Sequence, residues 1–445
     1  MPSPRSGISV SRKPSARGRR SWMLASARRF LKSAATLGAA VLLFWTAGAI
    51  GLRFAGGASE REPSAMAESL SPGARRLLDA AFEDVVPGAL LDHHVHVVGL
   101  GTNGTGTWVH PKMLNWSHPV SRVKALAYLS GARVSDPTHA DEQYVARLVD
   151  LARNSPAGRL LLLGFDYRYD QEGHRDPERS EFHTPNRYVV DLARTHPDLF
   201  VPAVSVHPHR ADAVEALHTW ANRGVRFVKW LPNAMGIDAS SRAHDEYYRV
   251  LIERNMVLLT HVGEEQAVEA EEDQKFGNPL LFRRPLDLGV TVVMAHAASL
   301  GTNEDLDSPG ETRSNFELFL RLMEEPRYEG KLYGEISAMT QVNRLPEPLV
   351  VLLGRSDLHH RLINGSDYPL PAINIVIQTR ALVRVGMLTP EEREWLNEIY
   401  AYNPLLFDYA VKRTIRHPES GSRFPASIFT GSDLGPAFSA SSPGG

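Results

Sequence analysis

The sequence contains no cysteine, and this absence excludes two kinds of site at once. A chain without thiols cannot form disulfides, and it cannot hold zinc through thiolates. Any metal must therefore be bound by histidine, aspartate, glutamate or a modified lysine.

The chain also lacks an excess of charge of either sign. Its formal net charge is −2, whereas nucleic-acid-binding domains usually carry a basic excess. We therefore expect no nucleic-acid partner. Hydrophobic residues make up 43% of the 445 residues and charged residues 22%, which is typical of a packed globular core. The length suits one large barrel with extensions.

Charged residues are absent from residues 33–52, which follow a basic segment at residues 1–32. About 20 apolar residues in a helix span about 30 Å, the thickness of the hydrocarbon core of a bilayer. A basic flank on the N-terminal side predicts that the N-terminus stays in the cytoplasm. The pattern predicts a cytoplasmic segment (1–32), a transmembrane signal-anchor helix (33–52) and a periplasmic or otherwise extracytoplasmic remainder.

Cleavage of this segment is an open alternative. Small residues at 47–49 and 55–58 are typical of signal-peptide cleavage sites. Residues 28–32 (Arg-Arg-Phe-Leu-Lys) resemble a twin-arginine export signal but lack the spacer between the arginines and the phenylalanine. The export route is therefore not assigned.

From residue 88 the chain alternates short apolar segments with amphipathic ones. The segments predicted as strands are 89–97, 159–166, 199–206, 225–231, 256–261, 290–296, 331–337 and 361–366. The segments predicted as helices are 141–153, 186–195, 211–223, 244–254, 315–325 and 346–355. This alternation indicates a parallel sheet with right-handed crossovers, and eight units favour closure. The predicted fold class is α/β, a (β/α)8 TIM barrel over residues 88–415.

The barrel is flanked by other predicted segments. Residues 53–87 are predicted to form a linker and a lead-in helix that begins after Ser71, with Pro72 in its first turn. Residues 99–140, after the first strand, read as a long irregular loop, which usually shapes or covers a site. Residues 416–445 are rich in Ser, Gly and Pro and are predicted to be disordered.

The first predicted strand carries a cluster of ligand-type residues. Residues two apart share a face of a strand. Asp92, His94 and His96 are therefore predicted to point one way, with His93 and Val95 on the other face. Two imidazoles on one face form a chelating pair.

Three more such residues end other strands. His261, His296 and Asp367 close the fifth, sixth and eighth predicted strands. Each alone is typical of a structural hydrogen bond or a turn. Together with the first strand they predict a divalent metal at the mouth of a barrel, where barrel enzymes keep their chemistry.

A second pair with the same spacing serves as a contrast. His207 and His209 follow the third predicted strand and have no carboxylate before them. We predict that they line the barrel mouth or are structural.

Residues 92–96 (Asp-x-His-x-His) and 365–369 (Gly-Ser-Asp-Tyr-Pro) resemble the amidohydrolase superfamily of metal-dependent barrels, above all its amidohydrolase-related branch. The resemblance covers residues 88–410. It implies four metal ligands: His94, His96, His261 and Asp367. It also implies that His296 either binds metal or polarises the substrate.

The same resemblance implies a metal-dependent hydrolase acting on a small molecule. A metal-bound water, with its pKa lowered to about 7, would cleave an amide, ester or lactone bond. Asp367 would act as general base and then as general acid. Zinc is the expected metal, although histidine and carboxylate ligands also accept Mn, Fe or Co. Barrels of this kind often pair, so a homodimer is one expected assembly.

Lys229, on the fourth predicted strand, leaves the number of metals open. A carboxylated Lys229 would bridge two metals, whereas a free ammonium would bind a substrate carboxylate or form a structural ion pair. Glu335, at the end of the seventh strand, is a candidate for bridging or substrate binding, or for a buried ion pair.

Two alternative functions remain. One is a lyase, a metal-dependent decarboxylase or hydratase of a carboxylate-bearing substrate, favoured by a basic pocket containing Lys229 and Arg122 or Arg133. The other is a tethered binding module without catalysis. Because every expected ligand position is filled, an enzyme is the stronger hypothesis.

Overall fold

The computed structural model describes residues 61–86, 88–156 and 158–430. The predicted basic segment at 1–32, the predicted transmembrane helix at 33–52 and residues 431–445 lie outside the described residues. Among the residues that are described, no helix has the length and apolar character needed to cross a membrane.

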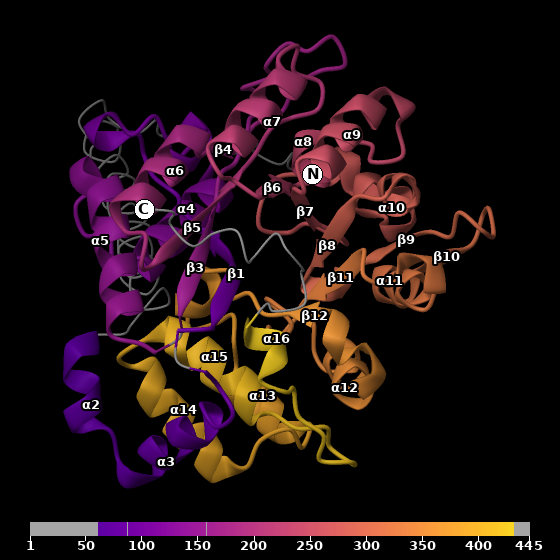
Figure 1. Cartoon of the computed structure of the whole chain (residues 1–445). Coiled ribbons are helices and arrows are strands. Elements are labelled where there is room, and N and C mark those ends of the chain that lie inside the picture. Colours follow the sequence, from indigo (N-terminus) through magenta and orange to yellow (C-terminus); the bar gives the residue numbers. More distant parts are fainter. Residues whose placement is uncertain (1–60, 87, 157, 431–445) are drawn as a thin grey trace, which may run out of the picture. The chain divides into compact units, whose positions relative to one another are not determined.

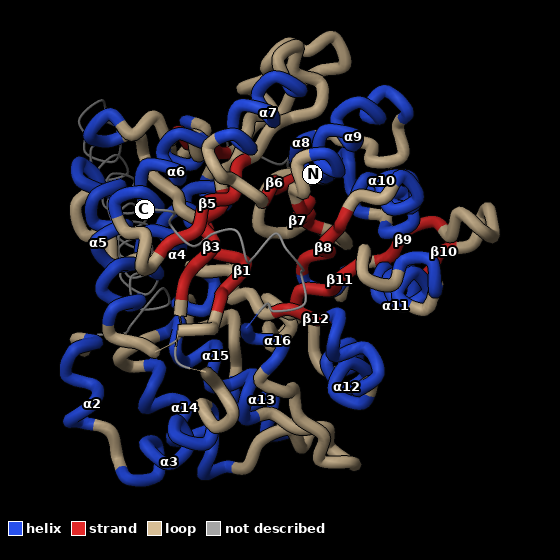
Figure 2. The backbone as a smooth tube through the Cα atoms, in the orientation of Figure 1, coloured by secondary structure: helices blue, strands red, loops and turns tan. Residues whose placement is uncertain are grey.

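Eight parallel strands form a ring at the centre of the described fold (Figures 1 and 2). Each is paired with its neighbour in chain order: β1 (Leu91–His96), β3 (Arg159–Leu163), β5 (Phe200–Val204), β6 (Phe227–Trp230), β7 (Val257–His261), β8 (Thr291–Ala295), β11 (Leu332–Glu335) and β12 (Leu362–Ile363). Every strand lies within a segment predicted as one. The predicted α/β barrel is confirmed.

The chain that follows β12 closes the barrel against β1. Three backbone N–H groups donate across this seam, at 2.7 to 3.0 Å: His93 to Asn364, Asp367 to His94, and His96 to Tyr368. Val95 and Tyr368 also form a parallel bridge. Closure therefore places the turn around Asp367 directly beside the histidines of β1.

Helices cover the outside of the strand ring (Figure 1). Six of them coincide with predicted helices: α5 (Ala140–Arg153), α6 (Asn186–Thr195), α7 (Ala213–Asn222), α9 (Asp245–Glu253), α11 (Asn315–Met323) and α12 (Glu347–Gly354). The strands are buried on both faces, against these helices and against each other inside the ring. This explains why the strands read as continuous apolar runs.

The lead-in helix and the C-terminal helices pack together below the barrel in Figure 1. α3 (Pro72–Ala81) begins as predicted, with Ser71 Oγ accepting a hydrogen bond from Ala74 N. Ser71 also donates through its N–H and its hydroxyl to Glu398 of α14 (Pro390–Tyr400), at 2.6 and 2.7 Å. α13 (Thr379–Arg384) and α15 (Pro404–Thr414) complete this group.

The segment predicted as an irregular loop contains regular structure. It includes α4 (Pro119–Gly131) and β2 (Trp108–Val109), and β2 pairs with β4 (Phe182–His183). Apolar and polar residues are not separated onto two faces of α4, so no helical pattern is visible in its sequence. The expectation that this segment covers a site is taken up below.

The described part of the predicted disordered tail, residues 416–430, is ordered, so the prediction is wrong for this part. α16 (Ser427–Thr430) lies against β12, and Phe424, Ile428 and Phe429 are buried. Asn364 N donates to Ile428 O at 2.9 Å. A few apolar side chains anchor a segment whose overall composition is polar.

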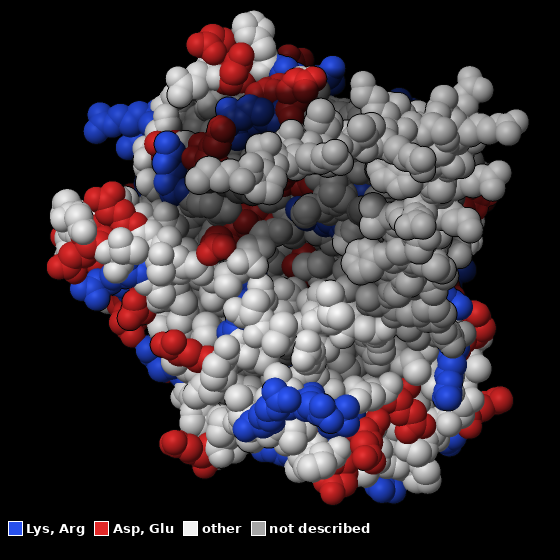
Figure 3. Space-filling view, turned by 180° about the vertical axis from the view of Figure 1, so that it is seen from behind, with Lys and Arg blue, Asp and Glu red and all other residues white. Residues whose placement is uncertain are grey.

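Charged side chains of both signs lie on the surface. Figure 3 shows acidic and basic side chains side by side over the described part of one face, which is hollowed near its middle. Exposed ion pairs contribute little to stability individually. The fold therefore depends mainly on the apolar layers inside and outside the strand ring.

Candidate metal centre and cavity

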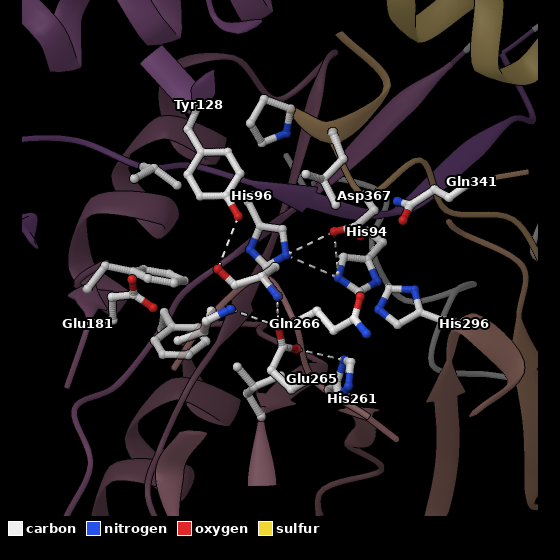
Figure 4. Close-up of a pocket in the computed structure, with 18 of the residues that line it drawn as sticks. His94, His96, Tyr128, Glu181, His261, Glu265, Gln266, His296, Gln341 and Asp367 are labelled. Atoms are coloured by element: carbon white, nitrogen blue, oxygen red, sulfur yellow. Dashed lines mark hydrogen bonds and ion pairs between the residues drawn. The ribbon is translucent and has the colours of Figure 1, made fainter. Parts of the chain in front are cut away.

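Three predicted ligands meet at the carboxyl end of the barrel (Figure 4). His94 Nε2 lies 3.2 Å from His96 Nε2, and Asp367 Oδ1 lies 3.2 Å from His96 Nε2 and 3.6 Å from His94 Nε2. Zinc bonds of about 2.1 Å place neighbouring tetrahedral ligand atoms about 3.4 Å apart. The spacing of the three atoms fits one divalent cation.

A β-bulge in β1 changes the predicted facing of its residues. The pairing of β1 with β3 shifts register between Asp92 and Val95. As a result His93 lies near Phe227 of the apolar barrel interior, with ring centroids 6.3 Å apart. Asp92 instead lines a small cavity on the outer side, beside Leu151. The prediction that Asp92 shares a face with His94 and His96 is wrong, because a bulge breaks strict alternation.

The ring nitrogens of His94 and His296 have distinct roles. His94 Nδ1 lies 2.9 Å from Glu335 Oε2, to which it donates. Ser337 Oγ donates its single proton to the same oxygen at 2.7 Å. Because the hydroxyl has no second proton, Ser337 Oγ accepts the hydrogen bond from His296 Nδ1, at 2.8 Å. Both imidazoles therefore carry their proton on Nδ1 and keep a lone pair on Nε2. Partners of this kind orient metal-binding histidines.

His261 follows the same arrangement. Its Nδ1 lies 3.2 Å from Glu265 Oε2, and its Nε2 is buried with no hydrogen-bond partner among the described residues. His261 is not in the group of His94, His96 and Asp367, whose ligand atoms all lie within 4.8 Å of one another. A buried imidazole lone pair without a donor is costly. This orphaned nitrogen fits a divalent cation as its partner.

A second close group contains His94, His296 and Glu335. Its atoms converge on the hydroxyl of Ser337, which contacts all three side chains at 2.7 to 3.4 Å. Because these atoms are already satisfied by hydrogen bonds, the group is an outer support for the first one.

Burial keeps these histidines neutral, as metal binding requires. Burial lowers the pKa of His261 to about 3, with the charge of Lys229 adding to the fall. Burial and Lys229 also hold the pKa of His94 well below its usual value. For His296, burial and the charge of Arg344 have the same effect.

Asp367 is held in place by β1. Asp92 Oδ1 accepts hydrogen bonds from Ser366 N at 2.8 Å and from His94 N at 3.0 Å, which ties the turn to the strand. Burial raises the pKa of Asp367, but the neighbouring imidazoles of His94 and His96, with a hydrogen bond to His96, lower it below its usual value. The carboxylate is therefore ionised at neutral pH.

The backbone is left-handed at two ligand-bearing turns. Asp367 has φ of 62°, and His296, Ala297 and Ala298 have φ of 57°, 47° and 51°. Residues with a Cβ rarely adopt this conformation, and it persists where the surroundings enforce it, often at functional sites.

Lys229 lies next to the three ligands. Its side chain is 1% exposed, and its Nζ donates to His94 Nε2 at 3.3 Å. Burial lowers the pKa of Lys229 to about 8, while Asp367 and Glu335 oppose the fall. Its position is compatible with both predicted forms, a carboxylated lysine and a free ammonium.

A cavity opens beside the three ligands. It is lined by most of the predicted site residues: His94, His96, Lys229, His261, His296 and Asp367. Glu335 is not among the lining residues, because it lies behind His94 as a hydrogen-bond acceptor. The structure thus supports a positioning role for Glu335 rather than direct contact with a substrate.

The arginine of this cavity is not one that was expected. Arg122 and Arg133 do not line it, and Arg133 lies 3.5 Å from Glu62. Arg344, from the loop after β11, lines the cavity and is buried, with its Nη1 donating to Ser299 Oγ at 3.0 Å. No pattern in the sequence distinguished Arg344 from other loop arginines.

The connections between strands supply further lining side chains, among them Tyr128, Glu181 and Glu265. Tyr128 belongs to α4, so the segment after β1 does cover the site, as its length predicted. Its hydroxyl donates to Ala267 O at 3.1 Å (Figure 4). Of these three residues, only Glu265 is singled out by the sequence, as a member of the acidic pair that follows His261.

Of the two roles predicted for His207 and His209, lining the barrel mouth or structural, the contacts support the structural one. Neither lines the cavity. His207 Nε2 donates to Met235 O at 2.9 Å, and its Nδ1 accepts from His209 N at 3.1 Å. Both ring nitrogens of His207 are therefore occupied by backbone groups.

Several solved structures resemble this chain at low identity. An uncharacterized TIM-barrel protein from Bordetella bronchiseptica matches with 16% identity over 70% of this chain and 99% of that one, at a TM-score of 0.42. 4-Oxalomesaconate hydratase from Rhodopseudomonas palustris matches with 11% identity over 71% and 96%, at 0.39. 5-Carboxyvanillate decarboxylase from Sphingomonas paucimobilis matches with 11% identity over 70% and 95%, at 0.37. Similarity at this level transfers no activity.

Among curated proteins, none matches this chain. A family model described as amidohydrolase matches residues 92–404. The match begins at the motif of β1 and extends past the turn that carries Asp367, and it spans more than half of the 445 residues. The chain therefore belongs to the amidohydrolase family, as its motifs predicted.

Proposed function

We propose that this protein is a metal-dependent hydrolase that cleaves an amide, ester or lactone bond of a small molecule. The supporting observation is the meeting of His94 Nε2, His96 Nε2 and Asp367 Oδ1 beside a cavity. Family membership supports an enzyme and leaves the reaction to be argued from the site.

The chain offers four ligands to a divalent cation: His94, His96, His261 and Asp367. Three imidazoles and one carboxylate suit zinc. When bound, the cation supplies a Lewis acid that polarises a carbonyl oxygen and lowers the pKa of water. Glu335 and Glu265 hold the Nδ1 atoms of two of these histidines and so fix which nitrogen faces the cation.

Asp367 carries the proton in this proposal. Its carboxylate is ionised at neutral pH and lines the cavity, so it accepts the proton of the attacking water and returns it to the leaving group. His296 donates through Nδ1 to Ser337, which leaves Nε2 as an acceptor. This tautomer supports cation binding or proton acceptance by His296, and not donation to a substrate carbonyl.

Lys229 determines how many metals the site holds. A carboxylated side chain beside His94 would bridge two cations, and an ammonium there would attract a substrate anion. Metal content per chain, measured by mass spectrometry on the purified protein, separates the two. About one metal supports the ammonium, about two support the carboxylated lysine, and none after reconstitution contradicts the proposed function.

A metal-dependent decarboxylase or hydratase is the second candidate, and Arg344 favours it. The guanidinium is buried, and its Nε has no hydrogen-bond partner among the described residues. Its Nη1 donates to a neutral hydroxyl, that of Ser299. A carboxylate on the substrate would complete these hydrogen bonds as a charge-assisted pair.

Product analysis separates the two reactions. The metal-loaded protein is incubated with esters, lactones and amides, and in parallel with unsaturated and aromatic carboxylates. Release of acid or alcohol supports the hydrolase, whereas release of carbon dioxide or net hydration without bond cleavage supports the lyase. In either case Arg344→Met should raise KM about tenfold or more for carboxylate-bearing substrates and much less for neutral ones.

A further inference from the structure

Glu181 lies in the cavity wall away from the metal ligands. It directly precedes β4 and is 3% exposed. In Figure 4 it lies on the opposite side of the pocket from His296. The proposed reaction leaves this buried acid without a role, although a buried carboxylate requires partners.

The two carboxylate oxygens of Glu181 differ in their surroundings. Oε2 accepts a hydrogen bond from Glu269 N at 2.7 Å. Oε1 is buried and has no hydrogen-bond partner among the described residues. The ammonium of Lys124 is 3.7 Å from Oε1, beyond hydrogen-bond distance. Oε1 therefore lacks the hydrogen bond that a buried acceptor needs, and Glu181 lines the cavity.

Apolar side chains also line the cavity near Glu181. Val109 and Met113 belong to one apolar cluster, against which Phe182 packs. The rings of Phe182 and Phe165 lie 4.2 Å apart between centroids. A ligand that extends from the metal ligands to Glu181 must therefore present an alkyl or aromatic body to these side chains.

The charges around Glu181 favour a neutral donor. Lys124 already lies beside the carboxylate, and Lys112 forms an ion pair with Glu269. A ligand ammonium would bring another cation into this group. A hydroxyl or amide N–H needs only the free lone pair of Oε1.

We infer that Glu181 is a specificity-determining residue whose Oε1 accepts a hydrogen bond from a hydroxyl or amide N–H at the far end of an apolar substrate. The inference rests on the proposed function, because it assumes that the bond to be cleaved lies at the metal ligands. The substrate class is a molecule with a carbonyl group at one end, an alkyl or aromatic body, and a neutral hydrogen-bond donor at the other end.

Binding of small probes to the full-length protein tests this inference without turnover. Dissociation constants are measured by ligand-observed NMR for 4-propylphenol, 4-propylanisole, propylbenzene and 4-propylbenzylamine. We expect the phenol to bind about tenfold more tightly than the anisole and propylbenzene, because only the phenol can donate to Oε1. The benzylamine should bind less tightly than the phenol.

Glu181→Gln should abolish the preference for the phenol. Glu269 N keeps the side-chain oxygen of the glutamine as its acceptor, which turns the amide NH2 toward the position of Oε1. That group donates equally well to a phenol and to an anisole oxygen. Glu178→Gln is the matched control, because Glu178 is on the same loop with its side chain 91% exposed and should leave all four constants unchanged.

Two results overturn the inference: equal binding of phenol and anisole to the wild-type protein, or a phenol preference that persists in Glu181→Gln. If the benzylamine binds more tightly than the phenol, the claim that the ligand's hydrogen-bond donor is neutral is wrong. The wild-type comparison holds even if the variant does not fold.

A separate binding experiment tests the metal site independently of the Glu181 subsite. 3-Phenylpropanohydroxamic acid, a metal chelator, should bind the metal-loaded protein and lose affinity after metal removal. If hydroxamate binding does not depend on metal but the phenol preference is present, the proposed function is contradicted and the inference about Glu181 is not. The reverse result contradicts the subsite alone.

Discussion

Two pairs of histidines with the same spacing lie at the carboxyl ends of strands of this barrel, one pair within β1 and one just beyond β5, and their environments differ. In the first pair, His94 and His96 bring their Nε2 atoms to 3.2 Å, and Asp367 joins them. The outer nitrogen of His94 is bonded to the buried carboxylate of Glu335. Two imidazole nitrogens and a carboxylate oxygen thus face one point.

In the second pair, His207 has no free ring nitrogen. One nitrogen donates to Met235 O, and the other accepts from His209 N. His209 Nδ1 in turn donates to Asp170 O at 2.9 Å. The difference between the pairs is the partner: a side-chain carboxylate leaves the opposite nitrogen available for a metal, whereas backbone groups on both nitrogens make the histidine a structural element.

The largest test of this contrast is removal of a histidine from each pair. His94→Ala should lower bound metal from about one to below about 0.1 per chain and reduce turnover at least about a thousandfold, more than the 10–100-fold typical of outer partners. His207→Ala should keep its metal and lose stability. Mass spectrometry and thermal unfolding measure the two effects. Metal loss in both variants would show that the spacing of the histidines, and not the type of hydrogen-bond partner, determines which pair binds metal.

Asp367→Ala separates binding from proton transfer. We expect turnover to be lost even when metal is supplied in excess, because no other carboxylate lines the cavity within the ligand group. Rates are compared at saturating metal and substrate. Hydrolysis retained by this variant contradicts the role of Asp367 as base and acid.

A smaller effect is expected from the carboxylate behind His94. In Glu335→Gln the remaining oxygen keeps the hydrogen bond from Ser337 N, which turns the NH2 group toward His94 Nδ1. The Nδ1 proton of His94 then has no acceptor, and the tautomer with a free Nε2 loses its advantage. Metal affinity should fall about 10–100-fold. The matched control is Glu329→Gln, an exposed glutamate hydrogen-bonded to His360 at 2.6 Å, which should leave metal affinity unchanged in a competition titration with a chelator.

The strands and ligands of this barrel could be predicted because their signals are local. Each strand is a short apolar run; His261 ends β7, His296 directly follows β8, and Asp367 comes in the turn after β12. α4 could not be predicted, because its apolar residues do not fall on one face. The order along the tail likewise depends on a few contacts, such as that of Ile428 with Asn364, which composition does not reveal.

The finer geometry of the site depends on contacts between distant segments. The bulge in β1 turns His93 toward the barrel interior and Asp92 away from it, and no residue type in the motif signals a bulge. Glu335 was identified as a candidate, but its place behind His94 depends on the pairing of strands. Arg344 and Glu181 are single charged residues in loops, and only folding shows that they are buried beside the cavity.

The smallest predicted effect concerns proton uptake by the structural pair. Burial lowers the pKa of His207 to about 3, and the hydrogen bond to Met235 O opposes the fall. An unfolded histidine has a pKa of about 6.5. Below that pH the unfolded chain binds a proton that folded His207 does not, so the stability present above about pH 6.5 is lost as the pH falls toward 3.

His207→Gln removes this proton uptake and can keep an N–H donor for Met235 O. Between pH 6 and 4 the free energy of unfolding of the wild type should therefore fall more steeply than that of the variant, by about 1.4 kcal/mol per pH unit. Urea unfolding at several pH values measures the slopes, and His174→Gln, whose side chain is 78% exposed, is the control. Protonation of the metal-facing histidines contributes to all three proteins and cancels in the difference. Equal slopes for wild type and His207→Gln would mean that folded His207 binds a proton, and the contacts that separate the two pairs would then have less effect on their chemistry than we infer.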